Sequence, residues 1–223
     1  MGEVVIQGVS RCFGKKDALR EVSLRIPSGC VFCIAGPNGS GKTTLLNILA
    51  GVLKQTEGRF EVKGSVGYAY QHPKLWEELT VKENILFFSN LAERGDEEWV
   101  KKVIEEMELG GLLDENVGEL SSGTRKRVEV AVGILSNPDV ILLDEPTAGL
   151  DAEAKRRVIE IIKFFKKEGK TVIITTHQLE DFGGVCDRLA VLNEGRVVSE
   201  RDVKGLGREE LMRIYTGSMG KVK

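Results

Sequence analysis

The stretch "VFCIAGPNGSGKTTLLNILAGVL" (residues 31–53) decides the fold, because a continuous apolar run leads through a glycine-rich turn into a helical pattern. The first five residues, "VFCIA", are typical of a buried strand, and "TTLLNILAGVL" has the apolar spacing of a helix. A strand, a glycine loop and a helix in this order form one α/β unit. The sequence therefore predicts an α/β protein.

The loop inside this unit, "GPNGSGKT" (residues 36–43), matches the phosphate-binding pattern G-x-x-x-x-G-K-[ST]. Its glycines let backbone N–H groups face phosphate oxygens, and the next helix adds its positive N-terminal end. Lys42 is expected to reach the β and γ phosphates of a nucleotide, and the Thr43 hydroxyl to ligate Mg²⁺. An ordinary glycine-rich turn is the weaker interpretation, since the motif lies between a strand and a helix.

A second candidate feature is "VILLDEP" (residues 140–146), which places Asp144 and Glu145 at the end of a buried strand. Ligands of open α/β sheets gather at the carboxyl ends of the strands. We expect Asp144 to hold Mg²⁺ through its water shell and Glu145 to act as general base on the attacking water. An Asp-Glu pair after a strand is by itself a common loop start, but the phosphate loop favours the functional interpretation.

Three single residues carry weaker signals. His177 follows the strand-like "TVIITT", and Gln71 follows "VGYAY". A lone histidine at a strand end is more often structural than catalytic, and an isolated glutamine persuades little. Beside a phosphate loop, both become candidates for sensing the γ-phosphate or the metal. Phe13 offers an aromatic face that could stack on a base, although a partly buried phenylalanine is nearly as good an explanation.

The segment "LSSGTRKR" (residues 120–127) predicts a second helix start suited to an anion, because hydroxyls and a glycine precede three cations. A solvated helix face is the alternative, and we keep that interpretation for Lys126.

The bulk composition sets limits on function. The 223 residues are 41% hydrophobic and 30% charged, as in an ordinary globular protein with a sizeable core. The net charge of −2 disfavours a general nucleic-acid binder. No apolar run approaches the roughly 20 residues that span a bilayer, and the first residues lack the features of a secretion signal. Cys30 and Cys33 in "CVFC" fit opposite faces of a strand better than half a metal site.

The rest of the chain divides into a mostly helical stretch and a stretch of alternating strands and helices. Residues 71–137 read as mostly helical: "TVKE" (80–83) fits a capping box, and Trp99 and Val103 share an apolar stripe that Gly110 and Gly111 should end. A further helix is expected from "SSGTRKR" to just before Asn137. Strands and helices then alternate, with a helix over residues 152–169, a hairpin around residues 193–195 and a last helix near "REELMRIY". We expect one domain over residues 1–223, whose core lobe (1–70 and 138–223) carries an antiparallel β-region and whose helical lobe is 71–137.

Taken in order, "GPNGSGKTT", Gln71, "LSSGTRKR", "VILLDEP" with "AGLD", and His177 make the chain resemble the ATP-binding subunit of ABC transporters over nearly its whole length. Many NTPases share the phosphate loop, but a signature of the "LSGGQ" kind shortly before "LLDEPTAGLD" is specific to this family. The resemblance implies a P-loop NTPase with a RecA-like core sheet, an antiparallel β-region and an inserted helical lobe.

The resemblance also implies roles for individual residues. Glu145, His177 and Lys42 would be catalytic, with Thr43, Gln71 and Asp144 at the metal. The ATP of the same subunit would contact Phe13, Gly36, Pro37, Asn38, Gly39, Ser40, Gly41, Lys42, Thr43, Thr44, Gln71 and Asp144. Ser121, Ser122, Gly123 and Asp151 would meet the ATP of a partner, because in this family two subunits join head to tail around two ATP molecules.

The implied cofactors are ATP and Mg²⁺. The implied partners are a second ATPase subunit, like or unlike, and a separate integral membrane permease that holds the chain at the cytoplasmic face of the membrane. No nucleic-acid partner is expected. Residues 70–91 should carry the groove for a permease helix, and "LTVKENILFFSNLAER" (residues 79–94) resembles the helical lobe of small exporters.

Departures from the family pattern leave alternatives open. Ser122 and Thr124 replace a glycine and a glutamine of the signature, and a side chain at 122 would crowd the site if the backbone there needs a positive φ. The first hypothesis is the transporter subunit that the resemblance implies. The second is a soluble ABC ATPase without a membrane partner, such as a subunit of a cluster-assembly scaffold. Because of Ser122, a non-hydrolysing nucleotide switch is a third hypothesis, although Glu145 argues against it.

Overall fold

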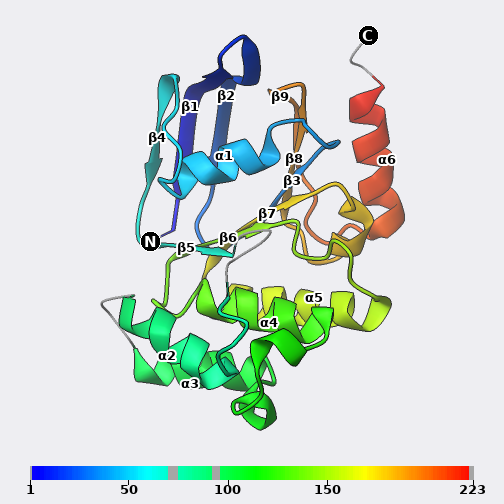
Figure 1. Cartoon of the computed structure of the whole chain (residues 1–223). Helices are drawn as coiled ribbons and strands as arrows, with labels where there is room; N and C mark the ends of the chain where they lie inside the picture. The colour runs from blue at the N-terminus through cyan, green and yellow to red at the C-terminus, as the bar shows by residue number, and fades with distance from the viewer. Residues whose placement is uncertain (1, 70–74, 92–95, 221–223) are drawn as a thin grey trace.

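The computed structural model describes residues 2–69, 75–91 and 96–220 of the chain. Within these ranges, six strands form a sheet with the order β5-β6-β7-β3-β8-β9 (Figure 1). Neighbours are parallel except for β9, which pairs antiparallel with β8. The strands are β5 (Val66–Ala69), β6 (Val140–Asp144), β7 (Thr171–Thr176), β3 (Val31–Ala35), β8 (Arg188–Asn193) and β9 (Arg196–Asp202).

A second sheet has three antiparallel strands in the order β2-β1-β4, which confirms the expected antiparallel β-region. These strands are β1 (Val4–Phe13), β2 (Lys16–Ile26) and β4 (Glu57–Val62). The short segment "EGRFEVKGSVGYA" contributes one strand to each sheet, because β4 pairs with β1 and β5 pairs with β6.

The parallel sheet separates two hydrophobic cores, because alternate side chains of a strand point to opposite faces. Phe32 and Ile34 of β3 pack in one core with α1 (Lys42–Leu49) and the antiparallel sheet. Cys33 packs in the other core with the helices on the far side. Cys30 lies at the edge of the first core, so the two cysteines of "CVFC" face opposite sides as predicted. Burial raises the pKa of the Cys30 thiol to about 11, which keeps it protonated.

The face of the six-stranded sheet opposite α1 is covered by helices (Figure 1). They are α2 (Val81–Leu91), α3 (Glu97–Glu106), α4 (Ser122–Val132) and α5 (Ala152–Lys167), with the short 3-10 turns η1 (Gly110–Leu112) and η2 (Val117–Glu119) between α3 and α4. The predicted capping box starts α2: the Thr80 N–H donates to the Glu83 carboxylate at 2.8 Å, and the Glu83 N–H donates to the Thr80 hydroxyl at 3.2 Å. Trp99 and Val103 are buried, as their stripe predicted.

Two helix ends were predicted too late. Helix α3 ends before Gly110, because Glu108 adopts a left-handed conformation (φ 49°) and the Leu109 N–H closes the turn on the Ile104 carbonyl. Helix α4 ends at Val132 rather than near Asn137. A Cβ on the next residue, Gly133, would lie 2.8 Å from the Tyr68 carbonyl oxygen, so the chain leaves the helix where it meets β5.

The prediction of a solvated position for Lys126 is wrong. Its side chain is 10% exposed, and its ammonium lies 3.2 Å from the carboxylate of Glu129 on the next turn. Helix α4 contacts α2, α5 and β5. A cation on this helix is therefore buried in a way that its own sequence pattern does not indicate.

The C-terminal elements follow the sequence predictions. Gly169 adopts a positive φ of 75° directly after α5, and Glu194 and Gly195 form the left-handed turn of the β8–β9 hairpin. The last helix, α6 (Arg208–Met219), packs on the 3-10 turn η3 (Leu179–Phe182). In the ranges that the structure covers, no helix is both long and apolar enough to cross a bilayer.

Candidate nucleotide-binding site

The phosphate loop is held against one strand from each of the two sheets. A Cβ on Gly36 would lie 2.1 Å from the Leu192 carbonyl oxygen of β8. Gly41 has a φ of 105°, and a Cβ there would lie 2.5 Å from the Ala18 carbonyl oxygen of β2. The Gly195 N–H of the β8–β9 turn donates to the Ser40 carbonyl at 3.0 Å. Gly36 and Gly41 are thus required by close backbone approaches, which fix the loop at the carboxyl end of β3.

Lys42 begins α1 and is almost fully buried. Its ammonium donates to the carbonyl oxygens of Gly36 at 2.8 Å and Pro37 at 3.2 Å. It also lies 3.4 Å from the Glu145 Oε1 atom. The cation is therefore fixed inside the curve of the loop, where the motif predicts a phosphate.

Glu145 lies between Lys42 and His177. Its Oε2 atom is 2.8 Å from the His177 Nδ1 atom and accepts the His177 backbone N–H at 3.2 Å. The carboxylate side chain is 7% exposed, and the residue has a left-handed backbone (φ 48°). Non-glycine residues adopt this conformation rarely, and often where a site requires it. The structure thus brings together the three residues predicted to be catalytic, from α1 and the ends of β6 and β7.

Asp144 has one carboxylate oxygen satisfied and one open. Its Oδ1 atom accepts the Thr175 hydroxyl, and its Oδ2 atom is buried without a hydrogen-bond partner in the part of the chain that the structure describes. A buried acceptor of this kind calls for a missing ligand or water. Thr43 is exposed on the first turn of α1. The Thr43 hydroxyl and the Asp144 carboxylate oxygen are ligands that suit hydrated Mg²⁺. The third predicted metal residue, Gln71, lies outside the described residues.

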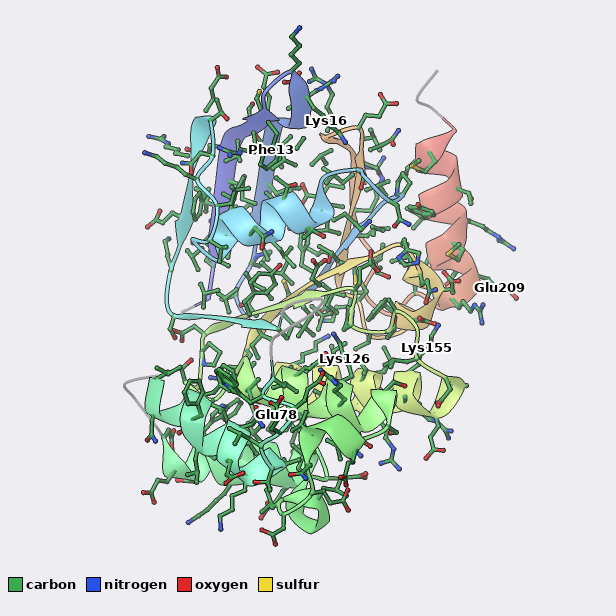
Figure 2. All side chains as sticks on the ribbon, viewed as in Figure 1. Phe13, Lys16, Glu78, Lys126, Lys155 and Glu209 are labelled. Atoms are coloured by element: carbon green, nitrogen blue, oxygen red, sulfur yellow. The ribbon has the colours of Figure 1, made fainter. Side chains whose placement is uncertain are left out.

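A cavity of about 450 Å³ opens beside the loop. Phe13, at the end of β1, lines it with 48% of its side chain exposed. The Arg11 guanidinium lies 4.5 Å from the centroid of the Phe13 ring, a cation–π contact. Figure 2 shows Phe13 and Lys16 at the same end of the β1–β2 hairpin. The other lining residues are Lys16, Ala18, Asn38, Gly39, Gly41, Lys42, Thr43, Thr44 and Glu145.

The segment predicted to face a partner's ATP lines a different cavity, of about 270 Å³. Ser121 caps α4 by accepting the Thr124 N–H at 3.2 Å, and Asp151 caps α5 by accepting the Ala154 N–H at 2.9 Å. The cavity is lined by Ser121, Ser122, Gly123, Thr124, Arg127, Asp151, Glu153, Ala154 and Arg157. None of these described residues lines the phosphate-loop cavity.

Comparison with known proteins decides the family. The family model described as ABC transporter matches residues 19–148. The chain belongs to this family. It is similar to the uncharacterized ABC transporter ATP-binding protein MJ1023 of Methanocaldococcus jannaschii, at 34% identity over 93% of this chain and 80% of that protein. It is also similar to Nod factor export ATP-binding protein I of a Rhizobium species, at 34% identity over 95% and 75% of the two chains.

A solved structure supports the same assignment. This chain, called the cassette below, resembles the ATP-binding cassette MJ0796 in a dimeric, post-hydrolysis state bound to ADP and Pi. The TM-score is 0.80, with 28% identity over 91% of this chain and all of that one. The predicted P-loop fold of the ABC type is thereby confirmed, and so are ATP binding and ATP hydrolysis as the activity of the cassette.

The signature of this cassette is compatible with its backbone. Ser122 is the first residue of α4 and does not have a positive φ, so its side chain adds no backbone strain. Gly123 is the constrained position, because a Cβ there would lie 2.9 Å from the Ala154 Cβ atom of α5. The glycine that this chain keeps is therefore the one that the packing of α4 on α5 requires.

Two contacts of the cassette were not predicted from its sequence. Thr175 orients Asp144 through its hydroxyl, but within "TVIITT" it looks like an ordinary β-branched strand residue. Arg11 covers one face of the Phe13 ring, and the spacing of two residues along β1 was the only available signal.

Proposed function

We propose that this cassette is the motor subunit of an ABC transporter and that it hydrolyses ATP at the interface of two subunits. The observation that carries the proposal is the Glu145 carboxylate, held between Lys42 and His177 at the phosphate-loop cavity. Hydrolysis measured with and without Glu145→Gln tests it. The separate cavity at Ser121 and Asp151 supports a second subunit, because those residues line no part of their own chain's phosphate-loop cavity. That subunit is a like or an unlike cassette.

The residues divide the chemistry between them. Loop N–H groups and Lys42 bind the β and γ phosphates, and Phe13 stacks on the adenine. Glu145 takes a proton from the water that attacks the γ-phosphorus, which leaves ADP and phosphate. His177 orients that carboxylate and contacts the γ-phosphate. When bound, Mg²⁺ would neutralise charge on the phosphates, held by Thr43, Asp144 and Gln71.

The proposal assigns residues 1–70 and 138–223 to the core lobe and residues 71–137 to the helical lobe. Ser121, Ser122 and Gly123 at the start of α4 then face the ATP of the partner, together with Asp151. ATP completes the interface, and its hydrolysis removes the group that held the interface closed. This change is what would drive a membrane partner.

The partner is a permease whose helix docks on an apolar patch of the helical layer. The patch consists of Trp76, Leu86, Phe87 and Leu91, whose side chains are 41–64% exposed. The rings of Trp76 and Phe87 meet edge to face with centroids 6.0 Å apart, so these two members of the patch are in contact. An exposed apolar cluster of this kind marks an interaction site. It lies in the region predicted for the permease groove, and docking there would hold the cassette at the cytoplasmic face of the membrane. The similarity to a Nod factor export protein favours export.

We expect Trp76→Ser combined with Leu86→Ser to release the cassette from membranes when it is expressed beside its neighbouring genes. Each exposed apolar side chain that is lost removes buried area at the docking site, worth about 25 cal/mol per Å². Immunoblots of membrane and soluble fractions measure the effect. Val52→Ser is the matched control, because Val52 is 58% exposed and does not belong to the patch. A wild-type cassette that stays soluble with a soluble partner would instead favour the cluster-assembly scaffold.

We expect Phe13→Ala to weaken ATP binding about tenfold, because base–aromatic stacking is worth about 1–3 kcal/mol and 1.4 kcal/mol is a tenfold change. Titration calorimetry with ATP measures the dissociation constant, and Phe13→Tyr should keep wild-type affinity because it keeps the ring. If the alanine variant binds ATP as well as the wild type does, Phe13 serves only to pack against Arg11.

A further inference from the structure

A lysine joins the start of α5 to the segment that follows His177. Lys155 lies on the first turn of α5, where its N–H donates to the Asp151 carbonyl at 3.0 Å. Figure 2 shows Lys155 above α5, on the side of the six-stranded sheet. Its ammonium donates to the Gln178 Oε1 atom at 2.9 Å and lies 2.9 Å from the Asp181 Oδ2 atom. The Lys155 side chain therefore connects α5, which Asp151 caps, to the turn η3, which follows His177.

This connection is partly shielded from water. The Lys155 and Asp181 side chains are 27% and 15% exposed, so solvent screens the ion pair less than it screens an exposed one. Gln178 is also fixed to β7, because its N–H donates to the Thr176 hydroxyl at 2.8 Å. Lys155 is thus bonded to a residue whose backbone adjoins His177.

The turn η3 is anchored by buried side chains and by α6. Leu179 and Phe182 of η3 are almost fully buried, as is Leu211 of α6, which packs on η3. The Gly184 N–H donates to the Leu206 carbonyl at 3.0 Å. Since α6 supports η3 from one side, the ion pair with α5 is positioned to set where η3 and His177 lie.

We propose that Lys155 is a positioning residue that couples the contact of Asp151 with the partner subunit to the placement of His177 against Glu145. The proposal rests on the proposed function, because it takes Asp151 to lie at the subunit interface. Closure of the dimer fixes the first turn of α5, and Lys155 carries that constraint through Gln178 to His177. Hydrolysis is thereby favoured only when the partner is in place.

The experiment replaces Lys155 with methionine, which keeps an unbranched side chain and removes the charge. We expect kcat for ATP to fall about tenfold with KM changed less than twofold, and the cooperativity of the rate in ATP to be lost. Lys155→Arg should restore both. Lys163→Met is the control, because Lys163 pairs with Glu160 on the exposed face of the same helix.

A second measurement separates positioning from folding. Asp181→Asn should reproduce the effect of Lys155→Met, and the double variant should be no slower than either single variant. In a Glu145→Gln background, Lys155→Met should leave the ATP-dependent dimer intact. Wild-type kcat and cooperativity in Lys155→Met would overturn the proposal, and so would loss of that dimer. If Glu145→Gln alone forms no dimer even with the permease present, the proposed function fails instead, whatever Lys155→Met does.

Discussion

Glu145→Gln should reduce ATP hydrolysis by at least about 100-fold, the usual contribution of a general base, while ATP still binds. Glutamine has nearly the same shape as glutamate, so the position between Lys42 and His177 can be kept. Its amide cannot accept the proton of the attacking water. The ATP that is not hydrolysed should then hold two subunits together, and the variant should elute as a dimer from gel filtration in ATP and as a monomer in ADP.

The matched control is Glu160→Gln, which removes a carboxylate of the same type from the exposed face of α5. It should hydrolyse ATP at the wild-type rate. Two outcomes would contradict the proposed role. Undiminished hydrolysis in Glu145→Gln would remove this residue as the base. A monomer at saturating ATP, with the permease also present, would count against a shared site.

The phosphate site could be predicted from the sequence because its geometry is set by backbone. Gly36 and Gly41 approach carbonyl groups of β8 and β2 so closely that no side chain fits. The ends of β6 and β7 bring Glu145 and His177 to the edge of the sheet at which β3 also ends, since parallel neighbours end at the same edge. Local pattern and fold agree at these positions, so the motifs predicted residues that the structure brings together.

Other features could not be predicted because partners far along the chain create them. Helix α4 stops where Gly133 meets Tyr68, and Lys126 is buried by packing from several elements. Neither neighbour is visible in the helical pattern itself. The contact between Lys155 and Asp181 joins helix α5 to the turn η3, which lies beyond strand β7 in the sequence. Charge patterns along one helix do not reveal pairs of this kind.

The third hypothesis, a non-hydrolysing switch, rested on Ser122. A serine would have been costly at a position with a positive φ, but Ser122 is an ordinary first residue of α4. The constraint falls instead on Gly123, which faces Ala154. Because the chain keeps a glycine there and also has Glu145 in place, the backbone at Ser122 gives no reason to disfavour hydrolysis.

Lys42→Ala should weaken ATP binding by about 10- to 100-fold, because a charge-assisted hydrogen bond is worth about 1.5–3 kcal/mol and 1.4 kcal/mol is a tenfold change. The ammonium already lies inside the phosphate loop, held by the carbonyls of Gly36 and Pro37. The loop N–H groups would remain as donors, but they carry no full positive charge. Titration calorimetry with ATP measures the change, and wild-type affinity in the variant would remove Lys42 from the proposed phosphate site.

The same substitution should lower the stability of the cassette, which could be mistaken for a binding effect. Glu145 loses its buried counter-charge, and breaking a buried ion pair by removing one partner costs about 3–5 kcal/mol. Adding Glu145→Gln to Lys42→Ala removes the unpaired charge, so thermal unfolding should return toward the wild-type midpoint. ATP affinity should stay low in the double variant, because the amide supplies no cation for the phosphates. Recovery of affinity together with stability would mean that Lys42 supports the fold and does not bind the nucleotide.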